Sequence, residues 1–174
     1  MATFAKKLIA AAALIAVTAG SAQAACWTPS AITAAKVRDF EAMLRTTATR
    51  CAKQVPTIKA SYDQFVRLSR PTFIEANAQI REHFAQDNGL VGSFSAYNQF
   101  LAGITGNYGA GIEAMSCTDL ERAIATATAG GATATVIARL ADENGSSPVI
   151  VGQRCSNRVI AANRSALIQQ VAIK

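Results

Sequence analysis

The chain has 174 residues, with 17 Lys and Arg against 11 Asp and Glu and with a single histidine. One histidine excludes a zincin pair or a histidine cluster that holds a metal ion. No stretch after the first 24 residues is apolar over the length that a membrane span needs, and the remaining length suits one domain.

Residues 1–24 have the layout of a cleavable export signal. Lys6-Lys7 precedes an apolar stretch from Leu8 to Val17, and small residues ending in Ala22-Gln23-Ala24 follow. The apolar stretch is shorter than the roughly 18 to 20 residues that cross a bilayer, which favours cleavage over a membrane anchor. We therefore expect a mature protein that begins near Ala25 and is periplasmic or secreted.

The exported part holds four well-separated cysteines, which in an oxidising compartment predict two disulfides. They are Cys26, Cys51, Cys117 and Cys155. Three pairings are possible, and up-and-down packing of helices favours Cys51 with Cys117 and Cys26 with Cys155. No CxxC pair indicates a zinc or redox site. Lipid attachment to Cys26 is an alternative, which Gln23 disfavours because a lipoprotein signal carries an apolar residue there.

Apolar spacing is helical almost throughout the mature chain, which predicts an all-α fold, a disulfide-stapled bundle of about five helices. The first helix is expected from about Thr33 to Cys51, with Glu41 and Arg45 as an ion pair on its outer side.

The second apolar stripe runs from Ile58 to Phe84. It keeps its phase across Pro71, which favours one long kinked helix. Against this, Thr72-Phe73-Ile74-Glu75 has the form of a capping box, which would start a new helix.

After Asn88-Gly89, Ser93 is expected to cap a third helix, whose apolar stripe is Phe94, Tyr97, Leu101, Ile104 and Tyr108. A fourth helix is expected to start at Cys117 with the capping box Thr118-Asp119-Leu120-Glu121. A fifth helix, with Val136, Ile137 and Leu140, stops at Gly145. Only Val149-Ile150-Val151 resembles a strand.

Charge divides the mature chain into a helical domain at residues 25–153, with 11 basic and 11 acidic residues, and a basic C-terminal tail at residues 154–174. The tail has no acid, and its basic residues are Arg154, Arg158, Arg164 and Lys174. Two interpretations stand: a solvated terminus, or contact with anionic lipid or a polyanionic envelope polymer. Nucleic acid is not expected as a partner, since the domain has no basic stripe.

Residues for catalysis are sparse. The acids considered for a glycosidase-type pair are Glu75, Glu82, Glu113, Asp119 and Glu121. Glu75 and Glu82 share a helix face, but acids spread over helices are usually solvated. His83 is expected to be partly exposed near a helix end, and the glycines from Gly106 to Gly111 lack the P-loop ending. We expect no cofactor and no catalytic residue; a small carboxylate-using envelope hydrolase is the alternative.

Three aromatic residues are candidates for binding: Trp27, Tyr97 and Tyr108. For Trp27, beside Cys26, a plug that packs over a disulfide at the end of the bundle is favoured.

The segments Cys26-Trp27-Thr28-Pro29, Ala34 to Phe40, Arg50-Cys51, Asn107 to Gly111 and Ser116-Cys117 resemble a set of small exported helical proteins of alphaproteobacteria with four cysteines. The resemblance implies export and four cysteines, and no catalytic residue. Such chains are loosely associated with the name S-adenosylhomocysteine hydrolase, but a short exported chain without a dinucleotide-binding strand-turn-helix disfavours that activity. We expect a non-catalytic domain that binds an envelope protein, as an immunity or inhibitor protein does, or unfolded clients, as a chaperone does.

Overall fold

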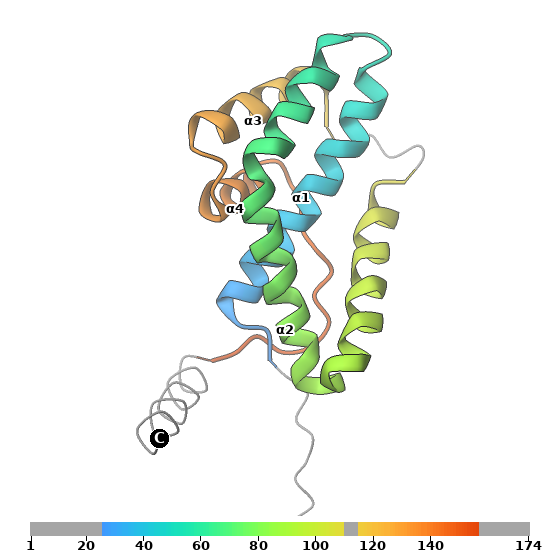
Figure 1. The fold of residues 1–174 in the computed structure, drawn as a ribbon. Helices are drawn as coiled ribbons and strands as arrows, with labels where there is room; N and C mark the ends of the chain where they lie inside the picture. The colour runs from blue at the N-terminus through green and yellow to red at the C-terminus, as the bar shows by residue number, and fades with distance from the viewer. Residues whose placement is uncertain (1–25, 110–114, 157–174) are drawn as a thin grey trace, which may run out of the picture.

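The computed structural model describes residues 26–109 and 115–156. These residues form four helices, α1 (Pro29–Cys51), α2 (Thr57–Asn107), α3 (Cys117–Ala129) and α4 (Ala134–Glu143), and no strand (Figure 1). The all-α class is thereby confirmed. The predicted signal at residues 1–24 and all but the start of the basic tail lie outside the described residues.

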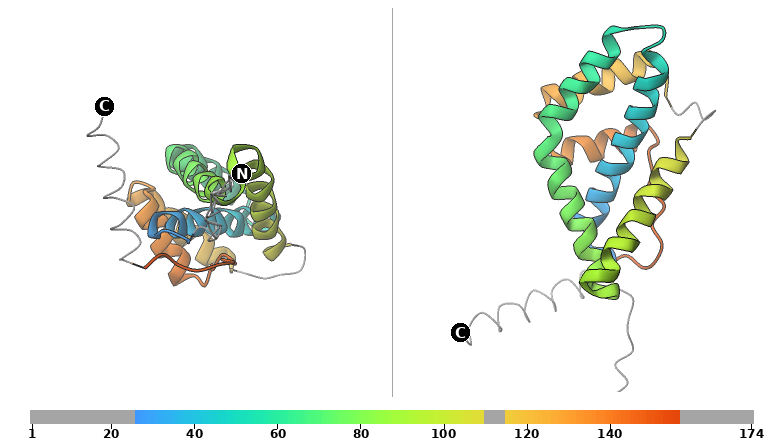
Figure 2. Two further views of the ribbon diagram at one scale, coloured as in Figure 1. Left: turned by 90° about the horizontal axis from the view of Figure 1, so that it is seen from below. Right: turned by 45° about the vertical axis from the view of Figure 1, so that its right-hand side comes forward.

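Helix α1 is the central helix, and it begins four residues before the predicted start. Thr28 caps it by accepting a hydrogen bond from the backbone N–H of Ala31 at 3.1 Å, and Pro29 occupies the first turn, where its missing N–H costs nothing. The apolar residues that recur at steps of three and four in α1 are buried: Val37, Phe40, Leu44, Ala48 and Cys51. Val55, which the same spacing predicts on this face, lies after the end of α1 and is half-buried. In two views, α1 lies between the two halves of α2 (Figures 1 and 2).

Glu41 corrects the prediction of an outer ion pair with Arg45. It is buried, accepts a hydrogen bond from the Tyr62 hydroxyl of α2 at 2.7 Å, and lies 3.4 Å from the guanidinium of Arg38. The spacing of four residues places Glu41 and Arg45 one turn apart on α1, but α2 covers the side of α1 that carries Glu41. The contact also raises the pKa of Tyr62, through burial first and the Glu41 carboxylate second.

Helix α2 continues through Pro71, as the unbroken apolar phase predicts. The capping-box prediction at Thr72 is wrong: its hydroxyl donates to the carbonyl of Ala132 at 2.9 Å and so joins α2 to the loop before α4.

The sharp bend in α2 lies at Gly89 instead, whose φ of 64° and ψ of 178° leave the helical region. A left-handed φ favours glycine, which has no Cβ. The bend divides α2 into a first arm, residues 57–88, and a second arm, residues 90–107. The predicted interruption at Asn88-Gly89 is therefore confirmed, and the second and third predicted helices are the two arms of α2. Counted with α2 as one element, the described residues hold four helices instead of about five. Ser93 lies inside the second arm, where its hydroxyl donates to the carbonyl of Leu90 at 2.7 Å, and caps no helix.

Helices α3 and α4 start at caps of the same kind. Ser116 accepts from the N–H of Asp119 at 3.1 Å, and Thr133 accepts from the N–H of Val136 at 3.4 Å. The predicted start of α3 at Cys117 is correct, but its cap is Ser116 and not the box that begins at Thr118. Helix α3 packs on α1 and α2, and α4 packs on α1 and α3.

Both disulfides have the pairing that helix packing favours. Cys51–Cys117 joins α1 to α3 with 5.7 Å between Cα atoms, and Cys26–Cys155 joins the two ends of the described chain with 4.8 Å between Cα atoms. The Cys26 sulfur is thus not available for a lipid thioether. Each bridge stabilises the fold by about 2 to 4 kcal/mol, chiefly by restricting the unfolded chain. Two disulfides indicate an oxidising compartment.

Candidate functional site

The end of the molecule at Gly89 holds a cluster of aromatic rings around Trp27. Trp27 is 2% exposed, and its ring centroid lies 3.8 Å from that of His83, 5.8 Å from Phe84 and 5.6 Å from Phe100. Its indole N–H donates to the carbonyl of Val151 at 2.9 Å. Because Phe84 belongs to the first arm and Phe100 to the second, Trp27 fixes both arms of the bend.

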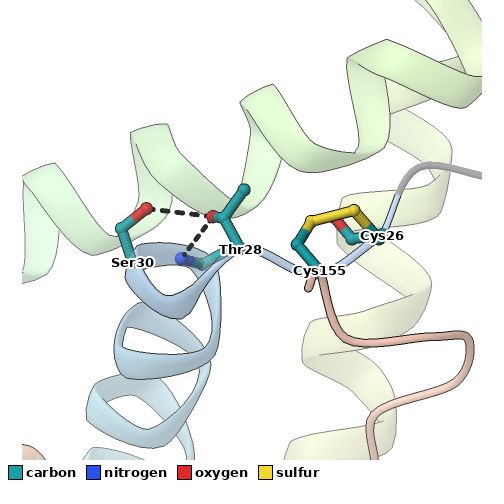
Figure 3. The surroundings of a disulfide bond; sticks show 5 residues. Cys26, Thr28, Ser30 and Cys155 are labelled. Atoms are coloured by element: carbon teal, nitrogen blue, oxygen red, sulfur yellow. Dashed lines mark hydrogen bonds between the residues drawn. A yellow bond between two sulfur atoms is a disulfide. The ribbon is translucent and has the colours of Figure 1, made fainter. Parts of the chain in front are cut away.

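The last described segment reinforces this cluster. Backbone hydrogen bonds join Trp27 N–H to the Gln153 carbonyl at 2.8 Å and Cys155 N–H to the Trp27 carbonyl at 2.9 Å. Val149-Ile150-Val151 forms no strand, and only a single bridge pairs Trp27 with Arg154. Figure 3 shows the Cys26–Cys155 bridge close to the Thr28 cap of α1. Trp27 is therefore a buried plug at this end of the bundle, and its ring packs against α2.

His83 differs from its predicted setting. It is 5% exposed and its ring lies 3.8 Å from that of Trp27, because the segment before α1 covers this side of the first arm. Burial lowers the pKa of His83, which the negative charge of Asp87 opposes. The imidazole is neutral at neutral pH and serves as a packing group.

Beyond this cluster, the bend exposes three large apolar side chains, which we call the apolar bend: Leu90, Val91 and Phe94. Their exposed fractions are 87%, 91% and 59%. Gly89 turns the chain so that the first residues of the second arm lie at the tip of the molecule, where both views show the bend (Figures 1 and 2). Such a group at one end of a small domain is a candidate binding surface.

Sequence reasoning placed Phe94 in a core stripe and did not single out Leu90 and Val91. A usable signal was present, since residues 88–112 contain no Lys, Arg, Asp or Glu. An uncharged stretch in which apolar residues directly follow a glycine is unusual for a segment that contacts only water.

The three predicted binding aromatics are all buried. Tyr97 is 9% exposed and lies beneath the guanidinium of Arg81 at 5.9 Å, Tyr108 is 8% exposed, and Trp27 is the plug described above. The predicted helical stripe that contains Tyr97 and Tyr108 faces the interior at both residues. None of the three forms the candidate surface, and Trp27 contacts Phe84 and Phe100 beside it.

A buried polar cluster explains Tyr108. The Asp39 carboxylate of α1 is fully buried and accepts from the hydroxyls of Tyr108 and Ser146, each at 2.6 Å. Burial, and next the hydrogen bond to Asp39, raise the pKa of Tyr108, so its phenol stays protonated. The cluster ties the end of α2 and the chain after α4 to α1, which is a structural role.

The described carboxylates among those considered for catalysis do not form a facing pair. Glu75 accepts from the Gln79 amide at 2.8 Å beside a hollow of about 290 Å³, while Glu82 lines a separate hollow of about 110 Å³. Asp119 is engaged by Ser116 and Arg122 at 2.6 and 2.7 Å, Glu121 is exposed, and Glu113 lies outside the described residues. Within residues 26–109 and 115–156, no group of three His, Cys, Asp or Glu could hold a metal ion.

Among the helices that the structure describes, none combines the length and apolar character of a membrane span. Comparisons of the chain with family models, curated proteins and solved structures find no match. The resemblance to small exported four-cysteine proteins therefore stays a prediction.

Proposed function

We propose that this protein is an exported, disulfide-stapled binding domain that docks on the bacterial cell envelope through the apolar bend. The observation that carries the proposal is the exposure of Leu90 and Val91, at 87% and 91%, beside a half-exposed Phe94. Burying one such side chain stabilises a complex by about 1.5 to 3 kcal/mol, so three together supply a useful binding free energy.

The residues packed around the bend hold the apolar bend in one conformation. Trp27 contacts rings of both arms, and the Cys26–Cys155 bridge holds its segment in place. A surface that is already ordered loses little conformational entropy when it binds. A small fixed surface supports recognition of one kind of target, as in immunity or inhibitor proteins, more than the broad binding of unfolded clients.

The alternative, a carboxylate-using envelope hydrolase, has weaker support. A glycosidase needs two acids on opposite sides of one bond. Glu75 and Glu82 are exposed, lie two turns apart on one helix and line different hollows.

Binding of the mature, oxidised protein to isolated bacterial envelope tests the proposal. The variant Leu90→Ser/Val91→Ser/Phe94→Ser should bind at least about tenfold more weakly, since it removes the apolar surface. A matched control is Leu68→Ser/Ile74→Ser, which changes two apolar residues of the first arm that are 51% and 59% exposed. The control should bind as the wild type does. Equal binding by the triple variant and the wild type would refute the proposal.

A further inference from the structure

We infer that a groove between the start of α1 and the first arm of α2 binds a linear aliphatic polyamine, with one terminal ammonium group at Glu82 and His83 and the other at Glu75. This site does not include the apolar bend and is independent of the proposed function.

The groove consists of two adjoining hollows, which share the side chain of Gln79. The smaller hollow measures about 110 Å³ and includes Thr28 and Ser30 at the start of α1, which Figure 3 shows beside α2. It reaches Gln86 on the first arm, and the larger hollow, of about 290 Å³, extends along the same arm to Pro71. The groove therefore follows about four turns of α2, which suits a long and narrow ligand.

The charge of the groove is negative. Its α2 side carries acids and amides at spacings of four, three and four residues, which place them on one helix face: Glu75, Gln79, Glu82 and Gln86. No Lys or Arg is among the described residues that line either hollow. A cleft lined by charges of one sign concentrates ligands of the opposite sign. Glu75 and Glu82 are separated by two helical turns, about 10 Å, and the terminal amines of extended spermidine span a similar distance.

His83 supplies a buried group for hydrogen bonding to the ligand. It lines the smaller hollow and is 5% exposed, and its ring nitrogens have no hydrogen-bond partner within residues 26–109 and 115–156. Buried polar side chains are usually hydrogen-bonded. Because burial lowers the pKa of His83, its imidazole is neutral and has one nitrogen that accepts a hydrogen bond.

The smaller hollow offers further acceptors. Gln79 donates its amide N–H to the carboxylate of Glu75 at 2.8 Å, so the amide oxygen of Gln79 is left as an acceptor. An ionised Glu82 only accepts. A primary ammonium group has three donors and no acceptor, and His83, Glu82 and Gln79 provide one acceptor for each donor. A neutral sugar lacks the charge that the carboxylates attract, and an anion would be repelled by them.

The larger hollow suits the methylene chain. Much of its lining is small and apolar: Ala34, Pro71, Ala76 and Ala134. The hydroxyls of Thr33 and Thr72, which also line it, donate to backbone carbonyls at 2.9 Å. Methylene groups therefore lose water against apolar side chains here, while Glu75 meets the second ammonium group.

Isothermal titration calorimetry of the mature, oxidised protein with spermidine tests the inference. We expect butylamine, which has one ammonium group, to bind at least about tenfold more weakly, and the neutral sugar maltotriose not to bind. Glu75→Gln and Glu82→Gln should each weaken spermidine binding by about fivefold, since each removes one charge-assisted hydrogen bond. The matched control is Glu121→Gln, which removes an exposed acid of α3 outside both hollows and should bind as the wild type does.

The single histidine gives a second readout at the site itself. At constant pH, the Cε1–H signal of His83 in the NMR spectrum should shift as spermidine is added, with the midpoint that calorimetry measures. Binding without this shift would place spermidine elsewhere and overturn the inference.

Three further results would also overturn it. The first is the absence of spermidine binding. The second is an equal loss of affinity in Glu121→Gln and in the two groove variants, which would show diffuse attraction to surface acids. The third is binding of maltotriose that Glu82→Gln weakens, which would assign the groove to neutral sugars. None of these results would affect the proposed function, because the apolar bend takes no part in the site.

Discussion

The two ends of this bundle each carry a disulfide, yet only one of them is closed. At the Cys51–Cys117 end, Cys51, Ile58 and Leu120 are fully buried where α1, α2 and α3 meet. At the Cys26–Cys155 end, the bridge and Trp27 fix the bend of α2, while Leu90 and Val91 stay almost fully exposed. The first bridge therefore closes a core, and the second holds an exposed surface in place.

Replacing the plug should have the largest effect on stability. Trp27→Ala should lower the free energy of unfolding by about 3 to 5 kcal/mol, because it leaves a large cavity between the two arms. Urea unfolding measures the change. Phe94→Ala is the matched control at the same end and should cost less than about 1 kcal/mol, since Phe94 is 59% exposed. Similar costs for both variants would contradict the division into plug and surface.

Removing the bridges one at a time separates their roles. Cys51→Ser/Cys117→Ser and Cys26→Ser/Cys155→Ser should each lower the free energy of unfolding by about 2 to 4 kcal/mol. Only the second variant should also weaken envelope binding under conditions where both are folded. Alkylation of the denatured, unreduced mature protein at four thiols would show that neither bridge exists.

The buried cluster at Asp39 should give an intermediate effect. Tyr108→Phe removes the 2.6 Å hydrogen bond to a buried carboxylate and should cost about 1.5 to 3 kcal/mol in thermal or urea unfolding. Envelope binding should not change, because the cluster is remote from the apolar bend along α2. A variant as stable as the wild type would mean that Ser146 alone satisfies Asp39.

Acid should weaken the bent end through His83. Its pKa is lowered in the folded state, so below the ordinary value of about 6.5 the unfolded chain binds a proton that the folded protein resists. Stability should therefore fall as the pH drops from 7 through about 6.5 and level off only below the folded pKa. His83→Phe, which keeps a ring against Trp27, should remove this slope in urea unfolding between pH 7.5 and pH 5. An unchanged slope would assign the effect to other groups.

Serine substitutions at the apolar bend should have the smallest effect on folding. Leu90→Ser, Val91→Ser and Phe94→Ser should each change the free energy of unfolding by about 0.5 kcal/mol or less, since these side chains contribute little to the core. A large loss in any of them would mean that the residue is needed for folding and not for binding.

The sequence pattern was sufficient to predict the helical class, the continuity of α2 through Pro71 and the pairing of the cysteines. Periodicity records which residues share a face, as for Val37 and Phe40. It does not record what covers that face, which is why Glu41 and His83 are buried against prediction and Phe94 is exposed.

The bend at Gly89 illustrates the second limit. Asn88-Gly89 indicated an interruption, but one left-handed residue can end a helix or redirect it, and the packing of Trp27 against both arms decides between these outcomes. The candidate surface was not predicted because its exposure depends on the direction that the chain takes after Gly89.

Covalent footprinting of the side chains tests the central claim most directly. The mature protein is labelled with hydroxyl radicals, free and bound to isolated envelope, and the modified residues are read by mass spectrometry. We predict that Leu90, Val91 and Phe94 lose most of their labelling on binding while Leu68 and Ile74 keep theirs. Unchanged labelling at the three residues of the bend, with protection elsewhere, would contradict the account.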